Sequence, residues 1–258
     1  IVEYRDSAND SFQTGGFGLI QQKEFRRDAY GGSIAKYLDR HDLKFGLEFE
    51  DQEATVVKRM SGGQRVDILA NPEGGPDIYS HFYWTTPLAT VGDAPTSALV
   101  APVAHENTVA YLQDRWQVTP ALSLNLGMRW DRQEIFDRFG RRVIDLKDDY
   151  APRLGFTWTP GAEGHSKLYG SYGQYYEQIP MDLVIRSFAQ ERQARIFNYD
   201  PLSTSPDAGA EFDLGRDSVI LGGFTEEADP NLKNQYVNEF ILGYEREIMP
   251  DVAVGVKG

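Results

Sequence analysis

Cysteine is absent from the 258 residues, which excludes disulfides, thiolate metal sites and cysteine nucleophiles. Long apolar runs are missing too: no stretch approaches the roughly 18 residues that a membrane helix needs. The mean hydropathy is −0.47, a value typical of soluble proteins. Such an average does not exclude membrane β-strands, because only alternate residues of those strands face lipid.

Positive charge is scarce. Lys and Arg number 26 against 39 Asp and Glu, which gives a net charge of −13. This balance argues against nucleic-acid binding, which needs a basic surface to replace phosphate counterions. An acidic surface fits solubility, exposed loops or the attraction of cations.

Motifs that carry chemistry are also lacking. There is no Walker loop, dinucleotide fingerprint or G-x-S-x-G elbow. Pairs of carboxylates do not identify a glycosidase here, because a chain with 39 acidic residues contains many such pairs by chance. The histidines show no metal-ligand spacing: they are His41, His81, His105 and His165. We therefore predict no enzyme, no catalytic residue, no cofactor and no metal site.

Two acidic clusters leave two interpretations open. One contains Asp145, Asp148 and Asp149, and the other contains Glu226, Glu227 and Asp229. One interpretation is a Ca²⁺ site, because Ca²⁺ prefers loops rich in oxygen ligands, although neither cluster has the EF-hand spacing. The other is that each cluster is a solvent-exposed run of charged residues.

What the chain does have is period-two alternation, best seen in residues 122–131. In a strand, alternate residues point to opposite faces. One face would hold the apolar residues Leu122, Leu124, Leu126, Met128 and Trp130. The other would hold Ser123, Asn125, Arg129 and Asp131, and the same pattern places Arg153 on the polar face of a later strand.

The alternation recurs often enough to predict about eight strands in an all-β, antiparallel up-and-down meander. Short turns rich in Pro, Gly and Asp are expected near residues 38–42, 119–121, 160–165 and 249–251. Long polar links are expected at residues 51–106, 132–149 and 177–234.

Alternating short and long connections are typical of an outer-membrane barrel, with tight periplasmic turns and large outer loops. Lipid cannot hydrogen-bond the backbone, so a membrane sheet must close, with strands of about 9–11 residues. The Leu122 face would then meet lipid, and Ser123, Asn125, Arg129, Asp131 and Arg153 would face the lumen. The alternative is a soluble antiparallel sheet with one wet face.

Two features of the long links bear on recognition. Residues 181–196 have apolar side chains near helical spacing and predict a short helix. Aromatic residues crowd the first link and are predicted either to stack on a ligand or to anchor the loop to the barrel rim. They are Tyr79, Phe82, Tyr83 and Trp84.

Several ordered stretches resemble the barrel of TonB-dependent receptors of the Oar-like group. They are HDLKFGLEFE (41–50), YLQDRWQVTP with LSLNLGMRWD (111–131), APRLGFTW (151–158), KLYGSYG (167–173) and NLKNQYVNEFILGYE (231–245). The resemblance covers most of the chain from about residue 25 onward.

The resemblance implies a barrel of about 22 strands around a plug, opened by the TonB–ExbB–ExbD complex. We expect residues 1–258 to be a piece of one such barrel domain, without the plug and the closing strands. The expected location is the outer membrane of a Gram-negative bacterium, and the expected function is uptake of a siderophore, sugar or peptide. An adhesion, structural or protein-export barrel is the alternative, followed by a soluble β-rich binding module.

Overall fold

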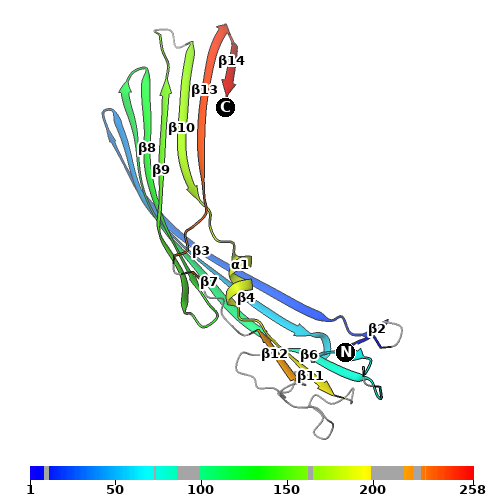
Figure 1. Cartoon of the computed structure of the whole chain (residues 1–258). Coiled ribbons are helices and arrows are strands. Elements are labelled where there is room, and N and C mark those ends of the chain that lie inside the picture. Colours follow the sequence, from blue (N-terminus) through cyan, green and yellow to red (C-terminus); the bar gives the residue numbers. More distant parts are fainter. Residues whose placement is uncertain are drawn as a thin grey trace.

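The computed structural model describes residues 1–8, 12–72, 74–85, 99–161, 165–198, 218–222, 228–229 and 231–258. In these residues the chain forms an eight-stranded sheet, a six-stranded sheet and one α-helix. Figure 1 shows the larger sheet as a long, curved array of strands, with the smaller sheet at its lower end. No helix among the described residues is long and apolar enough to cross a membrane.

The larger sheet is an up-and-down meander, as predicted. Its spatial order is β14-β13-β10-β9-β8-β7-β4-β3, every neighbouring pair is antiparallel, and β3 and β14 are its two edges. The strands are β3 (Leu19–Leu38), β4 (His41–Met60), β7 (Leu99–Thr119), β8 (Leu122–Phe136), β9 (Arg142–Trp158), β10 (Ser166–Tyr176), β13 (Tyr236–Met249) and β14 (Val252–Lys257).

The predicted short turns all lie at one end of this sheet, the upper end in Figure 1. They join β3 to β4, β7 to β8, β9 to β10 and β13 to β14. Asp39 and Asp251 have positive φ angles of 35° and 65°, a conformation that Asp tolerates in tight turns.

The prediction of long irregular links was wrong for much of their length. β4 has 20 residues and β7 has 21, about twice the predicted strand length, and only residues 137–141 separate β8 from β9. The strands continue because backbone hydrogen bonds do not require an apolar face. The hydrophobic alternation ends earlier than the ladder, so it marks only part of each strand.

Parts of two links and the first two strands of the chain build the smaller sheet, whose order is β12-β11-β6-β5-β1-β2. β5 and β6 come from the β4–β7 link, and β11 and β12 come from the β10–β13 link. One pair, β1 with β5, is parallel and departs from the expected antiparallel pattern. The elements are β1 (Glu3–Asp6), β2 (Phe12–Gly15), the 3-10 turn η1 (Ser61–Gly63), β5 (Arg65–Leu69), β6 (Ile78–Thr85), β11 (Arg192–Asn198) and β12 (Ser218–Gly222).

The predicted helix is present in its first half only. Helix α1 spans Met181–Phe188, and Gln190 follows it with a positive φ of 51°, which stops helical propagation. Residues 192–196, the last part of the predicted helix, belong to β11 instead, because β6 and β12 pair with both edges of that strand. Tertiary pairing therefore overrides the local helical spacing.

A small apolar core joins α1 to both sheets. Val184, Ile185 and Phe188 of α1 are buried, as are Phe82 and Trp84 of β6. They pack with residues of the larger sheet, among them Ala54, Val56, Ala101 and Val103. We call the face of the larger sheet that carries these four residues the inner face, and the opposite face the outer face.

Candidate functional site

The pairing register of the strands shows on which face of the sheet each of the predicted lumen and lipid residues lies. Two residues that pair directly across neighbouring strands lie on the same face. Starting from buried Val103, alternate residues of β7 lie on the inner face, and Asn125 pairs with Arg115 of this set. The predicted lumen residues all lie on the inner face: Ser123, Asn125, Arg129, Asp131 and Arg153. The predicted lipid residues all lie on the outer face: Leu122, Leu124, Leu126, Met128 and Trp130.

The outer face carries a continuous apolar band next to the short turns. Its large side chains are between 38% and 71% exposed: Phe45, Leu47, Leu112, Leu126, Met128, Leu154, Phe240 and Leu242. Apolar patches of this extent on a protein surface mark contact with a membrane or a partner.

Aromatic residues border the band on both sides. Trp116, Trp158 and Tyr244 lie towards the short turns, and Trp130 and Tyr150 lie at the opposite border. The Trp130 Nε1 atom donates to the Lys147 carbonyl oxygen at 2.7 Å, so the indole has a polar partner at this border. Along β8 the two borders are about 26 Å apart, close to the roughly 25 Å height of an outer-membrane apolar band.

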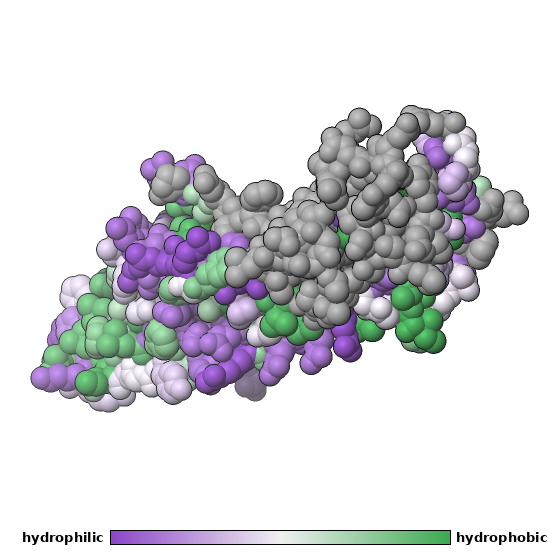
Figure 2. Space-filling model, turned by 90° about the horizontal axis from the view of Figure 1, so that it is seen from below, coloured by the Kyte–Doolittle hydropathy of each residue, from purple (hydrophilic) through white to green (hydrophobic). Residues whose placement is uncertain are grey.

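Charged residues replace the apolar ones beyond Trp130. The Arg132 guanidinium pairs with both carboxylate oxygens of Asp145, at 2.9 and 3.0 Å, and holds the pKa of that carboxyl below its ordinary value. The pKa of nearby Glu106 is raised by burial, and Asp51 and Glu134 add to this effect. Figure 2 shows a similar change along one face: hydrophobic residues gather at its left-hand end, and hydrophilic residues follow towards the grey ones.

The same ion pairs bear on the acidic cluster at 145–149. Asp145 is held by Arg132, and Asp149 accepts a hydrogen bond from Asn234 at 2.9 Å. In the part of the chain that the structure describes, no group of three or more acidic or histidine residues is arranged to hold a metal ion. Glu226 and Glu227 lie outside the described residues.

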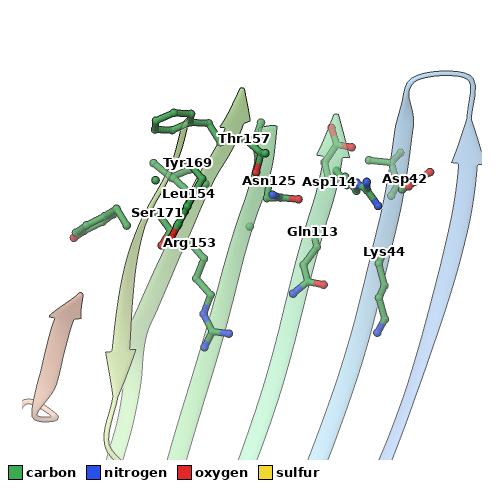
Figure 3. Close-up of a pocket in the computed structure, with 18 of the residues that line it drawn as sticks. Asp42, Lys44, Gln113, Asp114, Asn125, Arg153, Leu154, Thr157, Tyr169 and Ser171 are labelled. Carbon is green, nitrogen blue, oxygen red and sulfur yellow. The ribbon is translucent and has the colours of Figure 1, made fainter. Parts of the chain in front are cut away.

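The inner face is polar and hollowed near the short turns. A hollow of about 660 Å³ lies over β4, β7, β8, β9 and β10 (Figure 3). Lys44, Gln113 and Arg153 extend from its floor in the same direction, away from the short turns. A second hollow of about 160 Å³ adjoins it, and both are lined by Lys44, Gln113, Gly127 and Arg153.

Tyrosine rings line this face over glycines. Tyr111 lies over Gly46 so closely that a Cβ there would meet the ring at 2.3 Å, and Tyr175 covers Gly173 in the same way, at 2.7 Å. A cationic side chain stacks on each of these two rings. Lys44 Nζ lies 5.6 Å from the Tyr111 ring centroid. Arg153 Cζ lies 4.7 Å from the Tyr175 centroid. The polar alternation predicted the face of Arg153, but it did not indicate that a hollow forms there.

The aromatic residues of the first link lie on β6, in the smaller sheet. Phe82 and Trp84 are 6% and 5% exposed, and their rings pack edge to face with centroids 6.2 Å apart. This burial favours the anchoring interpretation for these two. The side chain of Tyr83 lies outside the described set, Tyr79 is half-buried, and ligand binding by any of the four stays a prediction.

An open antiparallel meander with short turns at one end, an apolar outer band and a polar inner face is the architecture of a β-barrel wall. The family model described as "TonB dependent receptor-like, beta-barrel" matches residues 2–249, so the chain belongs to this family. The family comprises receptors and transporters rather than enzymes, which confirms the predictions of family and of no enzymatic activity.

A curated relative extends the comparison. The TonB-dependent transporter Oar of Myxococcus xanthus is 24% identical over 280 residues, which cover 95% of this chain. The chain spans only 26% of the length of that relative. No solved structure matches the chain.

Proposed function

We propose that the chain forms part of the wall and outer face of a TonB-dependent receptor that moves a solute across the outer membrane of a Gram-negative bacterium. The observation that carries this proposal is the apolar band of the outer face, bordered by aromatic residues and backed by a polar inner face. Family membership and the similarity to the Oar transporter support it.

In this proposal the outer face meets lipid and the inner face lines the lumen. The short turns lie at the periplasmic end, and α1 with the smaller sheet lies at the outer end, where solute arrives. The TonB–ExbB–ExbD complex acts through the plug of the whole receptor. The solute is a siderophore, a sugar or a peptide.

The absence of cysteine makes a direct test possible. Single cysteines at positions 124–129 of the whole receptor, labelled with a fluorophore and placed in vesicles with brominated lipids, report lipid contact. We expect strong quenching at Leu124→Cys, Leu126→Cys and Met128→Cys, and weak quenching at Asn125→Cys, Gly127→Cys and Arg129→Cys. Uniform weak quenching would mean that the band does not meet lipid.

A further inference from the structure

Three separate stretches of the chain build the smaller sheet, and each contributes two neighbouring strands. The stretch before β3 supplies β1 and β2, the β4–β7 link supplies β5 and β6, and the β10–β13 link supplies β11 and β12. Figure 1 shows β6, β11 and β12 together at the lower end of the larger sheet. The stretches meet at two joints, β1 with β5 and β6 with β11. We call the smaller sheet, η1 and α1 together the outer body.

The joint between β1 and β5 is extended by close backbone contacts of η1. The Ser61 N–H donates to the Gly18 carbonyl oxygen at 2.8 Å, and the Gly18 N–H donates to Ser61 Oγ at 3.2 Å. At Gly62, which has a φ of 70°, a Cβ would come within 2.5 Å of the backbone of Ile1 and Val2. Backbone atoms do not move aside as the end of a flexible side chain does, so this joint tolerates glycine alone at position 62.

The joint between β6 and β11 combines a ladder with a buried aromatic ring. β11 pairs with β6 along its whole length, Arg192–Asn198. In the row that joins β5, β6 and β11, Phe82 pairs with Arg65 on one side and with Arg195 on the other. The two guanidinium carbons lie 4.8 and 5.4 Å from the Phe82 ring centroid. Cation–π contacts therefore tie one buried ring to both neighbouring strands.

Polar contacts also fasten the outer body to the larger sheet. Lys58 of β4 forms an ion pair with Glu191, which directly precedes β11. Gln133 of β8 is buried and holds the segment before α1 at two points. Its Nε2 atom donates to the Glu177 carbonyl oxygen at 3.0 Å, and its Oε1 atom accepts from the Ile179 N–H at 3.0 Å. These contacts add to the apolar core that α1 and β6 share with the larger sheet.

This connectivity makes each stretch dependent on the other two. Each stretch forms one antiparallel pair of strands, and an isolated pair of this kind is at best marginally stable in water. If one stretch left the sheet, its neighbour would lose backbone hydrogen-bond partners, and part of the buried core would meet water. The stretches that remained would then be less stable than before, which is the condition for cooperative opening.

We propose that the outer body is one cooperative unit, whose three stretches lose their structure together instead of acting as three independent loops. A molecule that binds to one stretch then stabilises the other two, so the unit couples parts of the outer end that are far apart in the sequence. The position of this unit at the outer end rests on the proposed function, and the lipid-quenching experiment tests that position separately.

The test is hydrogen exchange, followed by mass spectrometry, in the whole receptor in detergent. Gly62→Ala places a Cβ in the β1 joint and should lower protection factors at least about tenfold. We expect the same fall in β1, β5, β6 and β11, although β11 lies two strands away from β5. Gly161→Ala is the matched control, because Gly161 also has a positive φ, 93°, but lies at the short-turn end with no described atom within 4 Å of an added Cβ. It should change protection in the outer body less than about twofold.

Ile196→Ala makes the same test from the other side, because Ile196 of β11 is fully buried. It should lower protection in β1 and β5 as strongly as in β11, at least about thirtyfold. In either variant, a fall confined to the stretch that carries the change overturns the proposal. An equal fall in β9 and β10 near the short turns overturns it too, since the outer body would then have no opening of its own. Equal falls within the outer body, in a receptor without the expected lipid contacts, would overturn the proposed function alone.

Discussion

Leu126 and Asn125 are sequence neighbours that the β8 register places on opposite faces of the larger sheet. In the proposed orientation, Leu126→Arg puts a charge in the apolar band. We expect it to lower the free energy of unfolding in lipid vesicles by roughly 2–4 kcal/mol. Asn125→Arg on the inner face should lower the free energy of unfolding much less. Equal losses at both positions, measured by urea titration in vesicles, would contradict the assignment of the faces.

His105 is a second residue whose surroundings predict a measurable effect. It lies on β7 beyond the Trp130 border and is 1% exposed. Burial lowers its pKa below 6.5, although Glu50 and Gln133 act in the opposite direction. The folded state therefore binds this proton less readily than the unfolded state does.

The sign of the pH effect follows from this difference. Stability contributed by neutral His105 is present above about pH 6.5 and is lost as the pH falls below that value. We expect the hydrogen-exchange protection factors of amides in β7 and α1 to fall between pH 7 and pH 5, and His105→Gln to reduce this fall. An unchanged pH profile in the variant would show that other groups cause it.

At the scale of elements, α1 is held by three buried side chains rather than by its own length. It has eight residues, too few for an isolated helix to be stable in water. Phe188→Ala should destabilise the α1 core by about 3–5 kcal/mol, because it removes a large side chain that is 5% exposed.

Leu183 on the same helix is the matched control, since it is 53% exposed. Leu183→Ala should change stability by less than about 0.5 kcal/mol. Hydrogen exchange of the α1 amides would report both effects. Similar protection in the two variants would mean that the segment is held by its backbone and ion-pair contacts, such as Lys23 with Asp182 at 3.0 Å.

At the scale of the whole molecule, the larger sheet has two edges that pair with nothing among the described residues. β3, a strand of 20 residues, forms one edge, and β14 forms the other. Unpaired edges of this length promote association. Residues 1–258 expressed alone in detergent should therefore form oligomers or aggregates by light scattering. A stable monomer would show that these edges are protected by other means.

The sequence by itself determined the main sheet. Period-two alternation and the Pro, Gly and Asp turns were enough to predict eight strands, their order and the faces of residues such as Leu126 and Arg129. These are local properties, because a side chain's face depends on its position in its own strand. Family membership followed from the ordered motifs for the same reason.

Only the tertiary structure decided how the links fold. Beyond Trp130 the outer face of the strands becomes charged and the buried apolar residues, such as Val56 and Val103, lie on the inner face, so the alternation of the apolar band does not continue to the strand ends. Residues 192–198 became β11 because β6 supplied a partner from more than 100 positions earlier in the sequence. Charge pairing was likewise hidden, since it depends on which side chains the register brings near: Glu48 of β4 lies 3.4 Å from Arg129 of β8, 81 positions away in the sequence.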